Sequence, residues 1–379
     1  MKNALRFDVK AMVDRYALPL RLRAEITTVC DGNLDRVLSR TRISNKAASF
    51  KTQERRVYTI CRSFQELRDL RFKIESAHSL AGKHIAALVE YWVGAEQEGG
   101  TIENKLSHLR AFCEWMGKRG VVKPLDDYVD RREAGLVRSY VTTTDKSWIA
   151  AGVDAAAKIA EIAREYPRVA VQLKLQAAFG LRIEESFSLK PASALLNLDT
   201  LRISHGTKGG REREVPTQLR LAVLEEAMGL VDPARGSTTP AHYTIARWRG
   251  HYNFVLSKFG ISKKGLGVTS HGLRHQWLQE YYESLTGVPA PVKGSAERAP
   301  VEAHRVALLS AVEAAGHSKP SKTGAYLSTY AAMEKTQVRR VTKQEAEEMV
   351  RALNGNKSLA AERLGVSRPA LYRALGRTY

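Results

Sequence analysis

Six polar residues between positions 180 and 330 have the side chains needed to move a phosphate ester from one oxygen to another. Without a metal ion, this reaction needs cations that neutralise and orient the phosphate oxygens, and guanidinium groups do both through paired hydrogen bonds. It also needs a nucleophile that forms a covalent ester, and groups that give and accept protons. The sequence has all of these side-chain types, in the order Arg182, Lys208, His271, Arg274, His317 and Tyr326.

Two short segments place such residues at helical spacing. Arg182 follows a glycine in AFGLRIEES, and Glu185 comes three residues later, so its carboxylate can hold the guanidinium in place. His271 and Arg274 are also three residues apart in SHGLRH, so both face the same side of a helix. Taken singly, each pair is equally typical of an ordinary surface, and only the ordered set favours a reaction centre.

The remaining candidates lie at turns. Lys208 is in TKGGRER, at the turn of a predicted hairpin, where a loop lysine could reach a substrate. His317 precedes Tyr326 by nine residues in GHSKPSKTGAY, a spacing that can cross a turn and return to one pocket. Alone, Lys208 would be an ordinary turn lysine, and Tyr326 would be an ordinary core tyrosine.

Mostly helical elements are predicted to position these residues. The segment REYPRVAVQLKLQAAFGLRIEESFSL reads as two helices joined at Gly180. TLRISHG and REREVPT alternate apolar and polar residues around the turn, which predicts a β-hairpin. Residues 287–300 contain three prolines and two glycines, so we expect a surface loop there. The predicted fold class is therefore mainly α with a small β-hairpin or sheet (α+β).

The N-terminal part, apart from residues 1–45, also has a helical pattern. Residues 1–45 are mixed and basic and predict no clear fold. A first helix is predicted from an apolar stripe at helical spacing, formed by Ile85, Leu88, Val89 and Trp92. A Gly-Gly pair ends this helix, and Thr101 is placed to cap a second one. Three widely spaced cysteines form neither a disulfide framework nor a zinc motif, so we expect buried thiols.

The last forty residues predict a helix-turn-helix. Thr342 and Glu345 form a capping box that begins one helix, and Ser358 is placed to cap the next. The segment KSLAAERLGVSRPALYRAL then has the glycine turn of the motif. On its second helix we expect DNA contacts from Ser367, Arg368 and Arg373, although a contact with a neighbouring protomer is the alternative.

The composition favours a polyanionic partner. Sixty Lys and Arg residues against forty Asp and Glu give a formal charge of +20, and such a surface attracts nucleic acid. No apolar run approaches the ~20 residues that cross a bilayer, and neither a lipidation signal nor a secretory signal is recognisable. We expect a cytoplasmic protein that associates with the nucleoid when bound to DNA and has no role at a membrane.

Together these motifs resemble the tyrosine recombinase (phage integrase) family. GLR-x-x-E, a hairpin lysine, H-x-L-R-H, G-H and a downstream Tyr occur in the family's order over about residues 144–330. The preceding helices are similar to its SAM-like core-binding domain, and the tail resembles a Fis-type helix-turn-helix. The domains expected are an extension (1–45), a core-binding domain (46–140), a catalytic domain (144–335) and a DNA-binding domain (341–379).

The resemblance implies a role for each matching residue at the phosphate. Tyr326 would attack it and form a 3′-phosphotyrosyl link. Arg182 and Arg274 would clamp it, and His317 would donate a hydrogen bond to it. Glu185 would support Arg182.

The resemblance also implies how protons and partners are used. Lys208 would be the general acid, and His271 would assist as a base. No metal or cofactor is expected. Family members act as homo-tetramers on paired sites in double-stranded DNA, with accessory DNA-bending or directionality proteins as further expected partners.

Two alternatives and two departures from the family pattern stay open at this point. The chain could be a non-catalytic DNA-binding protein on a recombinase scaffold, or a type IB topoisomerase-like enzyme. The complete catalytic set argues against the former, and the added DNA-reading module against the latter.

The loop at 287–300 lengthens the interval before His317 and could displace it. Tyr330, on the same predicted helical face as Tyr326, competes with it as nucleophile.

Overall fold

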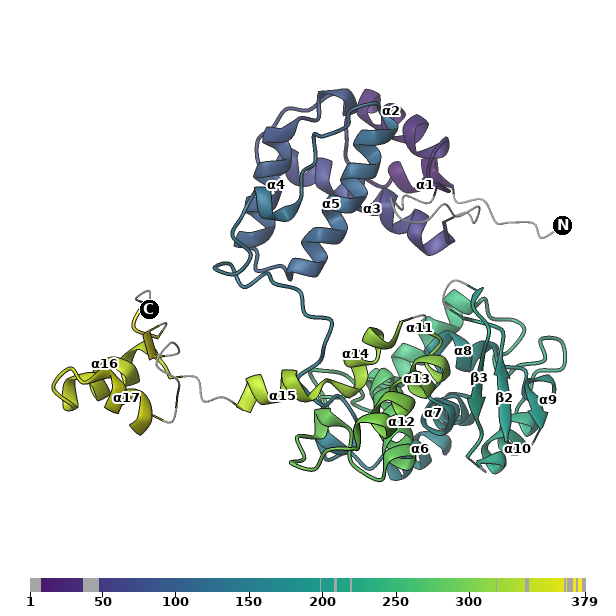
Figure 1. Cartoon of the computed structure of the whole chain (residues 1–379). Coiled ribbons are helices and arrows are strands. Elements are labelled where there is room, and N and C mark those ends of the chain that lie inside the picture. The colour runs from purple at the N-terminus through teal and green to yellow at the C-terminus, as the bar shows by residue number, and fades with distance from the viewer. Residues whose placement is uncertain are drawn as a thin grey trace. The chain divides into compact units, whose positions relative to one another are not determined.

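The computed structural model divides into two compact units, Met1–Ser139 and Tyr140–Tyr379, which are described separately (Figure 1). Both are mainly helical, and the second also contains a small antiparallel sheet. The predicted fold class is therefore confirmed. The structure describes residues 8–36, 48–197, 199–207, 210–218, 220–317, 319–337, 341–364, 366, 371–372 and 374–376.

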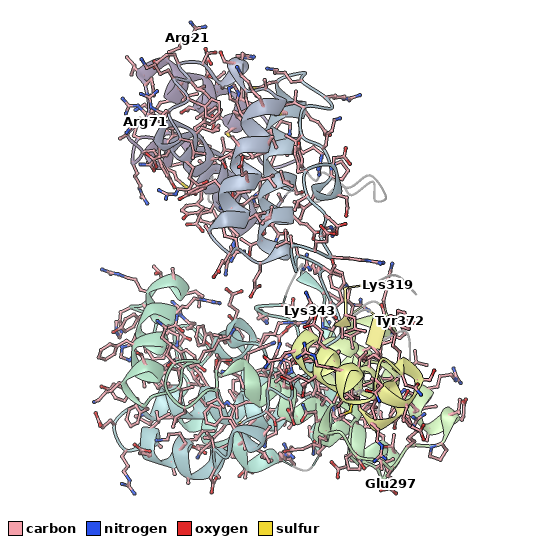
Figure 2. The ribbon with its side chains drawn as sticks, turned by 90° about the vertical axis from the view of Figure 1, so that its left-hand side faces the viewer. Arg21, Arg71, Glu297, Lys319, Lys343 and Tyr372 are labelled. Carbon is pink, nitrogen blue, oxygen red and sulfur yellow. The ribbon has the colours of Figure 1, made fainter. Side chains whose placement is uncertain are left out.

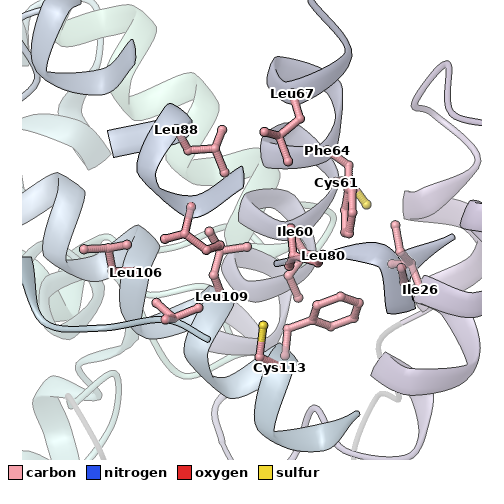
Figure 3. Close-up of a cluster of buried hydrophobic side chains, with 14 of the residues drawn as sticks. Ile26, Ile60, Cys61, Phe64, Leu67, Leu80, Leu88, Leu106, Leu109 and Cys113 are labelled. Carbon is pink, nitrogen blue, oxygen red and sulfur yellow. The ribbon is translucent and has the colours of Figure 1, made fainter. Parts of the chain in front are cut away.

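The first unit is a helical domain with one apolar core. The stripe predicted at helical spacing is buried in it, and so are Cys61 and Cys113 (Figure 3). Removal from water raises the pKa of the Cys61 thiol to about 12, as expected for a thiol that only packs. The helices are α1 (Val9–Val13), α2 (Leu20–Asp31), α3 (Phe50–Asp69), α4 (Gly82–Gly94) and α5 (Gly99–Trp115), with short 3-10 turns at Ala77–Ser79 and Leu125–Asp127.

Two features of this unit differ from the sequence prediction. α1 and α2 lie in the segment without a predicted fold, yet Leu22, Ile26 and Cys30 of α2 are buried in the core. Helix α5 begins at Gly99 with Glu98 at its N-cap, so Thr101 lies inside the first turn and does not cap it. Basic side chains such as Arg21 and Arg71 project outward (Figure 2).

The second unit is organised around one helix, α7 (Pro167–Phe179). Leu175 and Phe179 belong to one apolar cluster, whereas Val169 and Leu173 belong to another. Because α7 is enclosed on several sides, it has no single apolar stripe. The other helices are α6 (Ala155–Ala163), α8 (Ile183–Ser188), α9 (Pro191–Ala194), α10 (Leu221–Gly229), α11 (Ile245–Lys258), α12 (His271–Thr286), α13 (Val301–Ala314), α14 (Gly324–Leu327) and α15 (Tyr330–Gln337), with 3-10 turns at Ile149–Ala151, Pro291–Lys293 and Pro320–Lys322.

The predicted hairpin is present. Strands β2 (Thr200–Ile203) and β3 (Arg213–Pro216) pair antiparallel, and β1 (Leu195–Asn197) adds a third strand on the β2 side. Inward-facing positions alternate along β3, where Arg213 and Val215 are buried. The sheet thus carries one buried arginine into the interior of the unit.

The segment 287–300 is more than a surface loop. Val288, Ala290 and Val292 are buried against the same apolar cluster as α12 and α13. Its prolines and glycines interrupt helices, as predicted, but its apolar residues form part of the core. The surface-insertion prediction is therefore wrong for residues 288–292 of this segment.

The C-terminal segment has its own small core. It contains α16 (Lys343–Ala352) and α17 (Lys357–Arg363), with Ala346, Ala360, Leu364 and Leu371 buried together. Thr342 and Glu345 form the predicted capping box. Asn356, rather than Ser358, caps α17, because its side chain accepts from the Leu359 N–H. Lys343 and Tyr372 are labelled in Figure 2.

Among the described residues, no helix is both long and apolar enough to cross a membrane.

Candidate active site

Arg182 is positioned by the sharp end of α7. Gly180 ends this helix in the left-handed region, with φ +57°, and a Cβ there would lie 2.4 Å from Trp277 Cε3. Only glycine fits such a turn without strain. Arg182 then forms the N-cap of α8, where its backbone N–H donates to Glu185 Oε2 at 2.7 Å. Its Nη1 donates to Glu185 Oε1 at 2.7 Å, so Glu185 holds both the backbone and the guanidinium of Arg182.

Arg274 comes from the first turns of α12. Its side chain is 1% exposed, and its Nη1 donates to the Gly180 carbonyl. Nη2 donates to the Ala315 carbonyl at 2.7 Å. His271 is the first residue of the same helix and lies at the surface. The helix face that His271 and Arg274 were predicted to share therefore has a buried guanidinium and an imidazole at its exposed end.

A third guanidinium, not singled out in the sequence analysis, completes the cluster. Arg213 of β3 donates from Nη2 to Glu185 Oε2 at 2.6 Å and from Nη1 to the Ala314 carbonyl. Its side chain is 2% exposed. The alternation in REREVPT that predicted the strand also places Arg213 on the same face as buried Val215, so the signal was present in the sequence.

The three guanidiniums meet at the C-terminal end of α13. Arg182 and Arg274 both donate to the Ala315 carbonyl, and Arg213 donates to Ala314. The last carbonyls of a helix lack intrahelical partners and have partial negative charge, so cations stabilise them. This contact fixes the point where the chain leaves α13 towards His317.

Tyr326 lies in α14, against this cluster. The Arg274 guanidinium carbon is 5.5 Å from the centroid of its ring, and His317 Nε2 is 3.4 Å from its hydroxyl oxygen. The rings of His275 and His271 have centroids 4.8 and 6.0 Å from that of Tyr326. The loop at 287–300 therefore does not displace His317 from Tyr326.

The structure thus brings together six of the predicted site residues: Arg182, Glu185, His271, Arg274, His317 and Tyr326. The other predicted site residues lie outside the described residues: Lys208, Ser367, Arg368 and Arg373. His275, the second histidine of SHGLRH, is a further neighbour of Tyr326 that the sequence analysis did not select. It is buried, and its Nδ1 has no hydrogen-bond partner among the described residues.

The cluster shifts the pKa values of its members in consistent directions. Burial alone would raise the pKa of Glu185, but the charges of Arg213, Arg274 and Arg182 outweigh it and lower that pKa to about 2. Burial lowers the pKa of Arg213 to about 10, which leaves it charged at neutral pH. One carboxylate thus faces three guanidiniums, so the cluster has an excess of positive charge that favours a bound anion.

The two histidines of α12 are held neutral. Desolvation, together with the charges of Arg274 and Arg182, lowers the pKa of His271 to about 4, even though its edge reaches solvent. Desolvation and the neighbouring His271 lower the pKa of His275 to about 3. At neutral pH both imidazoles are therefore uncharged, and each has a ring nitrogen that can accept a hydrogen bond.

Tyr330 lies in a different environment from Tyr326. Ser328, with φ +63°, ends α14, and Tyr330 begins the separate helix α15. The two tyrosines therefore do not lie on one helical face, contrary to the prediction. The Tyr330 hydroxyl accepts from the Ala299 N–H at 3.0 Å and lies 3.3 Å from the Tyr282 hydroxyl.

Three family models match successive parts of the chain. Residues 36–122 match the N-terminal domain of phage integrases, residues 137–280 match the integrase domain, and residues 341–377 match bacterial regulatory proteins of the Fis family. The chain belongs to the tyrosine recombinase (phage integrase) family. Its C-terminal Fis-type module is the predicted helix-turn-helix. No curated protein sequence matches this chain significantly.

The integrase match ends at residue 280. The matched residues therefore include Arg182, Glu185, His271 and Arg274, but not the segment with His317 and Tyr326. The positions of these two residues rest on the geometry described above.

Several solved recombinase structures are similar to the chain. An XerH site-specific recombinase bound to a palindromic difH substrate has a TM-score of 0.47 and 15% identity, covering 86% of this chain and 92% of that chain. A lambda integrase dimer bound to a COC′ core site has a TM-score of 0.49 and 14% identity, covering 85% and 80%. The Tn1549 transposon integrase in complex with transposon right end DNA has a TM-score of 0.48 and 12% identity, covering 83% and 98%.

Proposed function

We propose that the chain is a site-specific DNA recombinase that breaks and rejoins strands through a 3′-phosphotyrosyl intermediate on Tyr326. The observation that supports this most is the Tyr326 ring beside buried Arg274, with His317 next to the hydroxyl. A phosphate held by Arg182 and Arg274 would lie within reach of that hydroxyl. Catalysis depends on such positioning of the reacting atoms.

The arginines have donors left for a phosphate. Arg274 Nε is buried and has no hydrogen-bond partner among the described residues. A buried donor without an acceptor costs free energy, and a phosphate oxygen would supply the acceptor. The excess positive charge of the cluster would stabilise the additional negative charge of the transition state.

The proposed step balances without a cofactor. The Tyr326 oxygen forms a bond to phosphorus while the bond from phosphorus to the 5′-oxygen breaks. Neutral His271 takes up the Tyr326 proton directly or through a water, and Lys208, outside the described residues, gives a proton to the departing 5′-oxygen. One phosphodiester replaces another, so the reverse step can rejoin the strand to a partner.

The test is covalent trapping on a nicked core-site DNA in EDTA. The wild-type chain is expected to give an SDS-stable protein–DNA adduct, because the proposed reaction uses no metal. Tyr326→Phe should give no adduct, whereas the matched control Tyr330→Phe should retain it. An adduct with Tyr326→Phe would assign the nucleophile elsewhere, and no adduct with the wild type would favour a non-catalytic DNA-binding protein.

The proposed assembly is a homo-tetramer on paired sites in double-stranded DNA. In it, residues 46–140 would form the core-binding domain, 144–335 the catalytic domain and 341–379 the DNA-reading module. We also propose that α1 and α2 belong to the core-binding domain, because α2 is buried in the same apolar core as α3 and α5. A species of four chains on two bound sites in light scattering would support this assembly, whereas a monomer active on unspecific DNA would favour a topoisomerase.

For the C-terminal module we propose binding to DNA beside the core site. Removal of residues after Val341 is expected to leave cleavage of a core site intact and to weaken binding to a longer native site. Equal affinity of both proteins for the longer site would contradict a DNA role for this module. Affinity should also fall steeply with salt, because bound phosphates release counterions.

A further inference from the structure

We propose that Arg213 is a positioning residue for the phosphate-binding arginines, acting from β3 through Glu185 and through the turn that precedes His317. This inference rests on the proposed function, because the residues it positions are those assigned to the phosphate. Arg213 is not a catalytic residue. Whereas the Arg274 guanidinium lies over the Tyr326 ring, Arg213 donates to Glu185 and to the Ala314 carbonyl, so it acts on the residues that hold the phosphate.

The first contact is with Glu185, whose two oxygens are used by different arginines. Oε1 accepts from Arg182 Nη1 at 2.7 Å, whereas Oε2 accepts from Arg213 Nη2 at 2.6 Å and from the Arg182 backbone N–H at 2.7 Å. Arg213 therefore fixes the second oxygen and with it the plane of the carboxylate. Without Arg213 only the two bonds from Arg182 itself would hold the carboxylate, so Glu185 would fix the Arg182 guanidinium less firmly.

The second contact is with the end of α13. Arg213 Nη1 donates to the Ala314 carbonyl, next to the Ala315 carbonyl that receives Arg182 and Arg274. Gly316 then packs directly on Arg213, since a Cβ at Gly316 would lie 2.7 Å from Arg213 Cδ. Its φ of +64° turns the chain towards His317. Arg213 thus supports the turn that aims His317 at Tyr326.

The third feature is the position of Arg213 in the hairpin. It is the first residue of β3 and pairs with Ile203, the last residue of β2. The loop between these two residues contains Lys208. One buried side chain at the base of the loop therefore connects the hairpin, the Glu185 carboxylate and the His317 turn.

A purely structural role would predict a different outcome from a positioning role. A buried arginine that only stabilised the fold would, when replaced, lower stability and DNA affinity together. A positioning residue lowers the rate of the chemical step at saturating DNA while affinity is kept. It also acts partly through Glu185, so the combined loss of both residues should be smaller than the product of the two single losses.

The test compares Arg213→Met and Arg213→Lys with Arg202→Met, a matched control on the neighbouring strand whose side chain is 51% exposed. The measurements are the dissociation constant for nicked core-site DNA and the single-turnover rate of adduct formation at saturating DNA. Arg213→Met is expected to keep its affinity within about threefold and to lose about 100-fold in rate, the scale that a misplaced reacting group costs. Arg202→Met should match the wild type in both.

The Arg213→Lys variant and a double variant keep the test decisive if Arg213→Met folds poorly. Arg213→Lys keeps the charge at Glu185 but cannot also reach Ala314, so it should recover part of the rate. Glu185→Gln combined with Arg213→Lys should lose less rate than the product of the two single losses, because the part that acts through Glu185 is removed only once. Additive losses, or a wild-type rate in both Arg213 variants, would overturn the positioning role. An absence of adduct with the wild type would instead overturn the proposed function.

Discussion

Tyr326 and Tyr330 are four residues apart and have superficially similar neighbours. Each has an arginine over its ring, with Arg274 at 5.5 Å from the Tyr326 centroid and Arg298 at 5.2 Å from the Tyr330 centroid. Each also has a histidine close by: His317 beside Tyr326, and His304 beside Tyr330. Residue types alone would not separate the two environments.

The difference lies in what holds each arginine and each hydroxyl. Arg274 is 1% exposed and belongs to the Glu185 cluster, whereas Arg298 is 59% exposed and pairs with Glu334. The Tyr330 hydroxyl accepts a hydrogen bond from the Ala299 backbone N–H, so this hydroxyl helps to hold the fold together. A desolvated, preorganised cation is worth far more to a reacting phosphate than an exposed one. Burial and partners, not sequence spacing, therefore separate the proposed nucleophile Tyr326 from Tyr330.

The largest expected effect comes from exchanging the two arginines for alanine. Arg274→Ala should lower the single-turnover rate of adduct formation by about 100- to 1,000-fold, because one preorganised donor is lost. Arg298→Ala should stay within about twofold, since exposed ion pairs contribute little. Thermal melting of both variants controls for folding. Equal losses in the two variants would remove the distinction between the environments.

The next effect is a pH dependence of stability at Glu185. Its pKa in the folded chain, about 2, lies below the usual 4.5, so its contribution is present above pH 4.5 and is lost as the pH falls towards 2. The shift corresponds to about 3 kcal/mol. Wild type and Glu185→Gln should therefore differ most at pH 6 and converge as the pH falls from 4.5 towards 2 in urea unfolding, while Glu334→Gln should follow the wild type. A gap independent of pH would contradict this.

A smaller effect is expected for the hydroxyls themselves. Tyr330→Phe leaves the Ala299 N–H without its acceptor and should lower the free energy of unfolding by about 1–3 kcal/mol. Tyr326→Phe removes hydrogen bonds with the side chains of Arg274 and, at 3.4 Å, His317. It should cost less, because the Arg274 guanidinium keeps its bonds to the Gly180 and Ala315 carbonyls. Chemical denaturation of the two variants measures both values, and the reverse order would show that the Tyr326 hydroxyl is the structural one.

The smallest effect concerns the break between α14 and α15. Ser328 has φ +63° and ψ −165°, a region that is essentially open only to glycine, and it is buried. Such strain costs about 1–3 kcal/mol, and the entropy lost by glycine offsets about 0.5–1 kcal/mol of it. Ser328→Gly should therefore raise the stability by about 1 kcal/mol in urea unfolding. An unchanged or lower stability would mean that the backbone there is unstrained.

Local patterns account for much of what the sequence predicted correctly. The hairpin, the helices around the apolar stripe and the Thr342–Glu345 capping box depend on neighbours within a few residues. The errors at Thr101 and Ser358 are also local, because competing N-caps were available three and two residues earlier, at Glu98 and Asn356. Helix ends are set by small differences between such alternatives.

By itself, the sequence determined which reactive side chains the chain has and in what order, because these depend only on residue identity. The tertiary structure decided how they meet: Arg182 reaches a carbonyl 133 residues away and Arg213 one 101 residues away. It also decided that Ser328 separates the two tyrosines and that residues 288–292 are buried. Contacts of this range depend on desolvation and on the packing of distant elements, which no local pattern contains. For that reason the alternation in β3 could place Arg213 on the buried face, but its partners became visible only in the folded chain.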